Sequence, residues 1–334
     1  MVTPAIGTRD LTRLLNILLE TDTPVFIHGS PGIGKSFITA QMAAQRGWEL
    51  VDIRLSQLDP VDLRGIPSVV GEMTKWMPPI FFPRDENSQG ILFLDELNSA
   101  PPTVQSAIYQ LILDRAVGEY TLPKGWRIVC AGNRVNDKGI VFRLPSPLSN
   151  RMVHLVLEAN FEDFKVWAIE NGLHSYIIGF LSFRPDLLSQ EVPRDNETNP
   201  AFATPRSWTM VSTILKNVEK VAGIEPLVYG AIGYAAGVEF LSYVEVYKEL
   251  PDVEAILRGE SIEVPKNPSV LYALCATLLE RFERQYAEAL FSFSKSLPVE
   301  FAVMLIKDIF VKDDSIAELP AFDEWVESYG AIVV

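Results

Sequence analysis

Cysteine is scarce in this chain, and its scarcity excludes two classes of site. The 334 residues include two cysteines, Cys130 and Cys275, which lie too far apart to indicate a disulfide framework or a zinc site. We expect both to be buried, because unpaired cysteine is among the most buried residue types. No run approaches the roughly 20 apolar residues that a membrane span needs. The chain is therefore expected to be cytoplasmic, with no membrane partner.

Positive charge is also in short supply. The chain carries 29 Lys and Arg against 43 Asp and Glu, which gives a formal net charge of -14. An acidic total repels phosphate backbones, so nucleic acid is disfavoured as a partner. With 48% hydrophobic and 22% charged residues, the composition is that of a folded globular protein.

The texture of the sequence changes near its middle. Up to residue 158, apolar runs rich in β-branched residues alternate with helical patterns, which predicts an α/β fold with a parallel five-stranded sheet and helices on both faces. The predicted strands are Val25–His28, Leu50–Ile53, Ile91–Leu94, Ile128–Ala131 and Val153–Leu157. From 159 to 334 the patterns are helical. We therefore expect an α/β nucleotide-binding domain (1–158) followed by an all-α region (159–334).

Five helices are predicted in the second half. Their ranges are 161–171, 205–220, 237–250, 268–282 and 298–310. One start is well signalled, because Thr204 can cap the helix and Pro205 suits its first position. The polar, proline-bearing segment 189–203 is predicted to be an exposed loop.

A phosphate-binding loop is the strongest single motif. It consists of Gly29, Ser30, Pro31, Gly32, Ile33, Gly34, Lys35 and Ser36. This matches Gly-x-x-x-x-Gly-Lys-Ser/Thr, and it lies between a predicted strand and a helix that opens with Phe37, as the motif requires. Backbone amides and the helix N-terminus attract phosphate, and Lys35 reaches its outer groups. Residues 29–37 are therefore predicted to bind ATP, with Ser36 as a ligand of Mg²⁺.

Polar residues follow two further predicted strands. Asp95 and Glu96 end the strand at 91–94, where side chains line the ligand crevice of an α/β sheet. Asp95 fits a role in holding Mg²⁺, and Glu96 fits a base or water-orienting role. Asn133 follows the next strand and can hydrogen-bond the attacking water. His28 and His154, at strand positions, are expected to be packed and hydrogen-bonded rather than catalytic.

These motifs resemble the MoxR group of AAA+ ATPases, in the helix-2-insert branch, over roughly residues 24 to 210. Besides the phosphate loop, the ordered matches are Asp62-Leu63-Arg64-Gly65, Pro79-Ile80-Phe81, Asp95 to Pro102, Gln105-Ser106-Ala107, Gly132-Asn133, Leu144-Pro145, Asn150-Arg151 and Thr204-Pro205-Arg206. The resemblance implies a P-loop AAA+ sheet, an all-α lid and a C-terminal helical extension.

The resemblance also implies roles for three residues outside the phosphate loop. Asn133 looks like sensor 1, Arg151 like an arginine finger that reaches a neighbouring subunit, and Arg206 like the sensor 2 arginine of the lid. Arg143 competes with Arg151 as the finger. Where family members often have Asn-Pro at sensor 1, this chain has Asn133-Arg134, and the residue before the finger is the neutral Asn150.

Two β-hairpins are predicted within the α/β half. Alternating residues at 66–76 indicate a hairpin that interrupts a helix, with a turn at Gly71-Glu72. By resemblance it points into the pore of a ring, with Met73, Lys75 and Trp76 as candidate contacts. Packing is an equal alternative for Trp76. A second hairpin is predicted at 116–124.

Three functions follow as alternatives. The leading one is an ATP hydrolase at the subunit interfaces of a homo-oligomeric ring, a hexamer by expectation, that remodels a protein substrate, in this family often with a partner carrying a von Willebrand A domain. The second is the motor subunit of a nucleic-acid-directed system related to restriction GTPases. The third, a non-catalytic nucleotide switch, is disfavoured by the presence of Glu96, Asn133 and Arg151.

Overall fold

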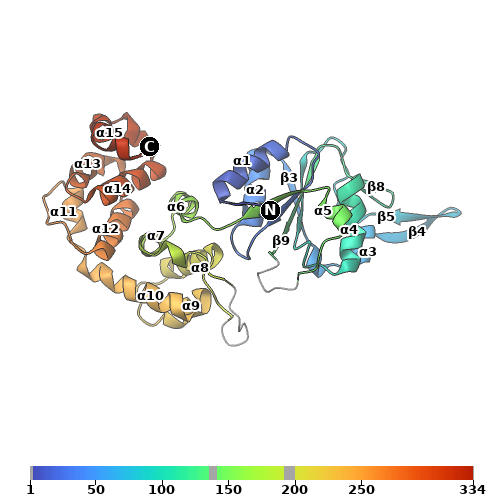
Figure 1. The fold of residues 1–334 in the computed structure, drawn as a ribbon, viewed down its shortest axis with the longest axis horizontal. Helices are drawn as coiled ribbons and strands as arrows, with labels where there is room; N and C mark the ends of the chain where they lie inside the picture. Colours follow the sequence, from blue (N-terminus) through green and yellow to red (C-terminus); the bar gives the residue numbers. More distant parts are fainter. Residues whose placement is uncertain (1–2, 135–140, 192–199, 334) are drawn as a thin grey trace. The chain divides into compact units, whose positions relative to one another are not determined.

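The chain divides into two compact units, an N-terminal unit Met1–Ala159 and a C-terminal unit Asn160–Val334. The computed structural model describes residues 3–134, 141–191 and 200–333. Figure 1 shows strands and helices in the first unit and helices in the second. No helix within these described ranges is long and apolar enough to cross a membrane.

A parallel sheet forms the centre of the N-terminal unit. Its strands are β1 Ala5–Ile6, β2 Val25–His28, β3 Glu49–Arg54, β6 Gly90–Asp95, β9 Trp126–Gly132 and β10 Val153–Leu157, in the order β1-β10-β2-β9-β6-β3. All five neighbouring pairs are parallel. The five predicted strands are confirmed. The predicted count was wrong by the edge strand β1, whose two residues are too short to show a periodicity.

Helices cover both faces of this sheet, as predicted. On one face, Phe26, Leu92 and Cys130 belong to the cluster that includes α4 Pro102–Asp114. On the other, alternate strand residues such as Ile27, Phe93 and Val129 join residues of α1 Thr8–Leu18 and α2 Lys35–Gln45. Burial on both faces explains why β6 is continuously apolar until Asp95.

Both predicted hairpins are present. β4 Ile66–Val70 pairs antiparallel with β5 Met73–Met77, and β7 Ala116–Val117 pairs with β8 Tyr120–Thr121. The first hairpin does not interrupt a helix, however: α3 Pro60–Arg64 precedes it, and none resumes between Met77 and β6.

A packed loop takes the place of the helix expected after the first hairpin. In that loop Phe82 is buried and stacks on Tyr120, whose hydroxyl donates to the Pro83 carbonyl at 2.8 Å. The loop that follows the first hairpin is therefore fixed to the second hairpin through Tyr120.

The C-terminal unit is helical in its described residues. Its longer helices are α6 Phe161–Glu170, α7 Ser175–Phe183, α8 Pro205–Lys216, α9 Glu225–Ile232, α10 Tyr234–Val244, α12 Pro268–Glu280, α13 Ala287–Ser294, α14 Val299–Lys312 and α15 Pro320–Val333. The predicted helix at 205–220 ends at Lys216, and that at 237–250 begins at Tyr234 and gives way to a 3₁₀ turn. The predicted Thr204 cap is confirmed. Much of the predicted loop at 189–203 lies outside the described residues.

Candidate nucleotide site

The phosphate loop connects the carboxyl end of β2 to the N-terminus of α2. Gly34 has φ 104, which a side chain would strain, and it allows the loop to turn directly into the helix at Lys35. The buried Lys35 ammonium donates to the carbonyls of Gly29 at 2.6 Å and Ser30 at 3.0 Å. The loop thus encloses a cation beside a helix N-terminus, an arrangement that attracts phosphate.

Ser36 and Asp95 meet across the site. The Ser36 hydroxyl donates to the Asp95 carboxylate at 3.2 Å. A hydroxyl beside a carboxylate supplies the oxygen ligands that Mg²⁺ prefers, and Mg²⁺ takes its other ligands from phosphates and water. The described residues contain no cluster of three or more His, Cys, Asp and Glu that could hold a metal alone. These two side chains therefore fit a metal that arrives with a nucleotide.

Glu96 adopts a conformation that is rare for a residue with a side chain. Its φ is 58, and its N–H donates to the Asp95 carboxylate at 2.8 Å. The Ser56 hydroxyl donates to the Glu96 carboxylate in a short contact. Such backbone strain persists only where surrounding contacts fix it, and it is concentrated at active sites.

Ser56 was not predicted from the sequence. It lies in the turn Leu55–Gln57, directly after β3. Since β3 neighbours β6, residues that follow these two strands meet at one edge of the sheet. The order of strands, which the sequence does not state, was the missing signal. Asp52 on β3 also has its pKa raised, first by burial and then by the negative charge of Asp95.

Asn133 follows β9 and is held by a residue that sequence reasoning did not single out. The buried Asn98 side chain donates to the Asn133 carbonyl at 2.7 Å. A Cβ at position 132 would lie 2.0 Å from Asn98 Oδ1, so glycine is required beside Asn133. The structure thus brings the phosphate loop, Asp95, Glu96 and Asn133 to the carboxyl ends of neighbouring strands.

The histidines are packed and hydrogen-bonded, as predicted. His28 Nε2 and His154 Nδ1 are 2.8 Å apart, and His154 Nε2 lies 2.8 Å from the Ser149 carbonyl oxygen. Burial, reinforced by His154 and Lys35, lowers the pKa of His28 to about 4. Both rings line a cavity of about 830 Å³, together with Asn98 and Arg143. Cys130 and Cys275 are buried, as expected.

Two of the predicted arginines, Arg143 and Arg151, belong to the N-terminal unit, and Arg206 belongs to the C-terminal unit. Arg143 and Arg151 are exposed, and within the described part of the chain neither forms an ion pair. Arg151 lies two residues before β10. Arg206 is exposed in the C-terminal unit, at the second residue of α8.

A phosphate loop with Asp95 and Glu96 on an adjoining parallel sheet defines a P-loop nucleotide-binding domain. Residues 24–163 match the AAA domain family of the dynein-related subfamily. The N-terminal unit therefore contains a domain of the AAA type, with a nucleotide-binding phosphate loop.

Two relatives each match less than half of this chain. Midasin from Dictyostelium discoideum is 27% identical over 154 residues, 42% of this chain and 3% of midasin. Midasin from Giardia intestinalis is 26% identical over 174 residues, 49% and 4% of the two chains. The chain thus spans a small fraction of the length of these relatives.

Solved structures similar to this chain include NtrX and RuvB, both at low sequence identity. NtrX from Brucella abortus aligns with a TM-score of 0.44 and 15% identity, over 92% of this chain and 69% of NtrX. RuvB from Thermotoga maritima aligns with a TM-score of 0.40 and 16% identity, over 85% and 89% of the two chains.

Proposed function

We propose that this chain forms a homo-oligomeric ring, a hexamer of the MoxR type, which uses ATP hydrolysis to remodel a protein partner. The observation that carries this proposal is the hairpin of β4 and β5. Val69 is 80% exposed and Met73 is 76% exposed, and Figure 1 shows the hairpin extending beyond the sheet and helices of its unit. Soluble monomers rarely leave such an apolar patch uncovered.

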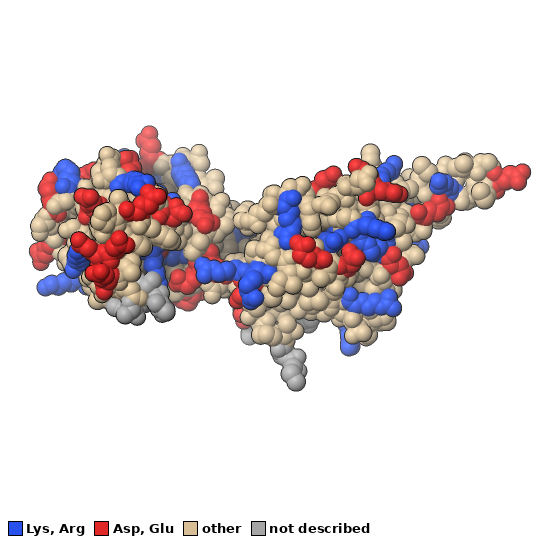
Figure 2. Space-filling model, turned by 90° about the horizontal axis from the view of Figure 1, so that it is seen from above, with Lys and Arg blue, Asp and Glu red and all other residues tan. Residues whose placement is uncertain are grey.

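The charge of the hairpin and of the visible surface supports a protein partner. Figure 2 shows the hairpin as mostly neither acidic nor basic, with basic and acidic groups interspersed over the rest of the visible face. A partner chain with apolar side chains fits such a surface better than a phosphate backbone does. Met73, Lys75 and Trp76 are the proposed contacts. The family resemblance suggests a von Willebrand A domain protein among the partners.

We assign the chemistry to residues of one chain and an arginine of the next. The loop 29–37 and Lys35 would bind the phosphates, while Ser36 and Asp95 would hold Mg²⁺, which neutralises phosphate charge when bound. Glu96 would orient the attacking water and Asn133 would hydrogen-bond it. Arg151 would supply charge across the interface, worth about 10³ to 10⁵ in rate in related systems. Arg206 would report the nucleotide state to the helical unit.

Mixing two inactive variants tests the shared site. Arg151→Ala subunits retain Glu96, and Glu96→Gln subunits retain Arg151. A mixed ring then contains interfaces with every catalytic group, so hydrolysis should reappear on mixing while each variant alone stays inactive. Steady-state phosphate release is the measurement, and native mass confirms that rings are mixed.

The control is a mixture of Arg151→Ala with a subunit that carries both changes, which provides no complete interface and should stay inactive. If confirmed mixed rings show no rescue, Arg151 does not act across the interface. The same experiment with Arg143→Ala would then test the competing finger.

A further inference from the structure

Arg134 joins three separate segments of the N-terminal unit. Its Nη2 donates to the Ser30 hydroxyl at 2.5 Å, and its Nη1 pairs with the Glu158 carboxylate at 2.7 Å. Ser30 is the second residue of the phosphate loop. Glu158 follows β10 directly, and its N–H donates to the Ile6 carbonyl of the edge strand at 3.0 Å. One guanidinium therefore ties the phosphate loop to the end of the sheet.

We propose that Arg134 is a positioning residue of the ATP site, which holds the phosphate loop in its binding conformation by fixing Ser30 against Glu158. The charge of Arg134 is matched by Glu158, so its contribution to the loop is a directed hydrogen bond rather than an unpaired positive charge. A guanidinium can bind two acceptors at fixed angles, which the ammonium of lysine cannot do. This role is independent of ring formation, because every group in it belongs to one subunit.

Comparing the affinities for ATP and ADP distinguishes a residue that shapes the phosphate loop from one that contacts the γ-phosphate directly. Amides of the phosphate loop bind the phosphates that ATP and ADP share. A residue that shapes the loop therefore affects the affinity for both nucleotides equally. A residue that binds the γ-phosphate affects the affinity for ATP alone.

The experiment measures the Kd of ATP and of ADP, with kcat and KM, in Arg134→Ala and Arg134→Lys. Loss of a charged hydrogen bond corresponds to about a tenfold change in Kd. We expect Arg134→Ala to weaken the binding of ATP and of ADP alike by about tenfold, with KM raised more than kcat is lowered. Arg134→Lys should recover only a minor part of the loss. Arg13→Ala, which removes an exposed ion-paired arginine on α1, is the matched control and should leave both affinities unchanged.

Two milder variants keep the proposal testable if Arg134→Ala folds poorly. Ser30→Ala removes the acceptor in the loop, and Glu158→Gln removes the ion pair while it leaves an acceptor. Each should weaken the binding of both ATP and ADP. The double variant Arg134→Ala with Ser30→Ala should bind both nucleotides no more weakly than Arg134→Ala alone. The proposal is overturned if only the binding of ATP is weakened, or if Arg134→Lys restores full affinity. It is also overturned if the losses of affinity in Arg134→Ala and Ser30→Ala add in the double variant. Failure here would leave the interface experiment on Arg151 unaffected.

Discussion

The two ends of the central sheet each have a residue with a strained backbone, but the surroundings of the two residues differ. Among the described residues, two that are not glycine have positive φ, namely Glu96 at 58 and Arg115 at 56. Glu96 follows β6 at the carboxyl end of the strands. Arg115 ends α4 beside the start of β9, at the amino end. The polar groups around Arg115 are bonded to other groups of the protein, whereas those around Glu96 are suited to a ligand.

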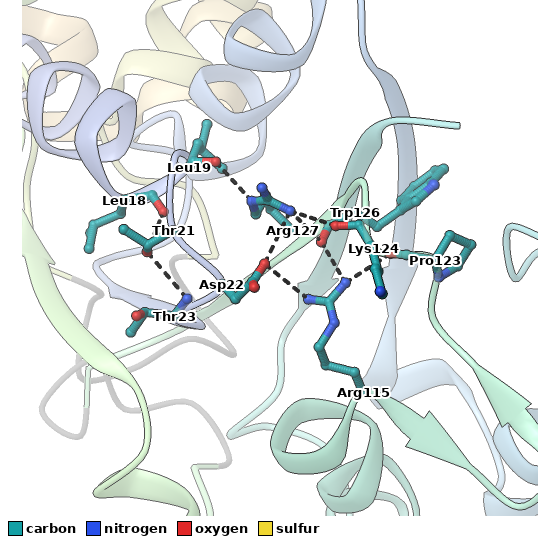
Figure 3. A network of polar contacts seen from close by, with 10 residues as sticks. All are labelled: Leu18, Leu19, Thr21, Asp22, Thr23, Arg115, Pro123, Lys124, Trp126 and Arg127. Carbon is teal, nitrogen blue, oxygen red and sulfur yellow. Dashed lines mark hydrogen bonds and ion pairs between the residues drawn. The ribbon is translucent and has the colours of Figure 1, made fainter. Parts of the chain in front are cut away.

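The amino end is internally satisfied. Arg115 Nη2 donates to the carbonyls of Pro123 and Trp126, both at 2.9 Å, and Arg127 Nε donates to the Leu19 carbonyl at 2.9 Å. The Asp22 carboxylate pairs with Arg127 at 3.3 Å, between the two guanidinium groups (Figure 3). These contacts connect the segment after α1, the second hairpin and β9, so they hold these three parts of the chain in fixed positions.

At the carboxyl end, Arg134 pairs with Glu158, whereas Asp95 and Glu96 take part in none of the ion pairs among the described residues. Asp95 and Glu96 accept hydrogen bonds from the hydroxyls of Ser36 and Ser56, and burial, followed by the charge of Asp95, raises the pKa of Asp52. Lys35 donates to the carbonyls of Gly29 and Ser30 in the phosphate loop. Carboxylates without a paired cation are suited to a divalent metal ion that is also bound by phosphates. The comparison therefore predicts that changes at the carboxyl end remove activity and changes at the amino end remove stability.

The largest expected effect is at the carboxyl end. Lys35→Ala should abolish detectable nucleotide binding, because the loop loses its cation. Glu96→Gln should preserve ATP binding and lower turnover by about 10³-fold or more, the scale expected when the nucleophile is no longer oriented. Fluorescent-nucleotide titration and phosphate release measure the two effects, and both variants should unfold like the parent. Tight ATP binding by Lys35→Ala, or normal turnover by Glu96→Gln, would contradict the assigned roles.

The amino end offers the converse test at Arg115. Arg115→Ala removes hydrogen bonds from a charged donor and should lower the free energy of unfolding by about 2–4 kcal/mol, with the ATP affinity of the folded protein unchanged. Arg115→Gly loses the same contacts but relieves the positive φ, so it should be about 1 kcal/mol more stable than Arg115→Ala. Urea unfolding with unchanged m-values measures the difference. Equal stability of the two variants would show that the backbone there is not strained.

The parts of the fold that the sequence predicted are those with local signals. The phosphate loop has fixed spacing between a strand and a helix, and the five strands are apolar runs with clear ends. β1 has two residues, and α7 is apolar on most sides, so neither shows a usable period. The short α11 Val253–Leu257 has the same difficulty. Tertiary packing rather than local pattern defines these elements.

The candidate site divides in the same way. Lys35, Ser36, Asp95 and Glu96 could be proposed from the sequence because each occupies a motif position. Ser56, which contacts Glu96, and Asn98, which holds Asn133, were missed because their contacts span tens of residues and depend on strand order. The strained φ of Glu96 has no sequence signal, since the residue type itself disfavours that conformation.

A dependence of stability on pH should originate at the carboxyl end, and it should be smaller than the loss of stability in Arg115→Ala. The pKa of His28 falls from 6.5 to about 4 on folding, mainly through burial beside His154. Between these values the unfolded chain binds a proton that the folded chain does not, so His28 stabilises the fold fully above pH 6.5 and this contribution is lost as the pH falls toward 4. Since the ring is partly exposed, we expect a loss of about 1–2 kcal/mol. Urea unfolding at pH 7 and pH 5 should show the loss in the parent and in Arg115→Gly, because the guanidinium network at the amino end does not titrate in this range. His28→Gln keeps a donor toward His154 but has no titrating ring, so its stability should change less over the same interval. A pH dependence equal to the parent in His28→Gln would place the titrating group elsewhere and would remove this distinction between the two ends of the sheet.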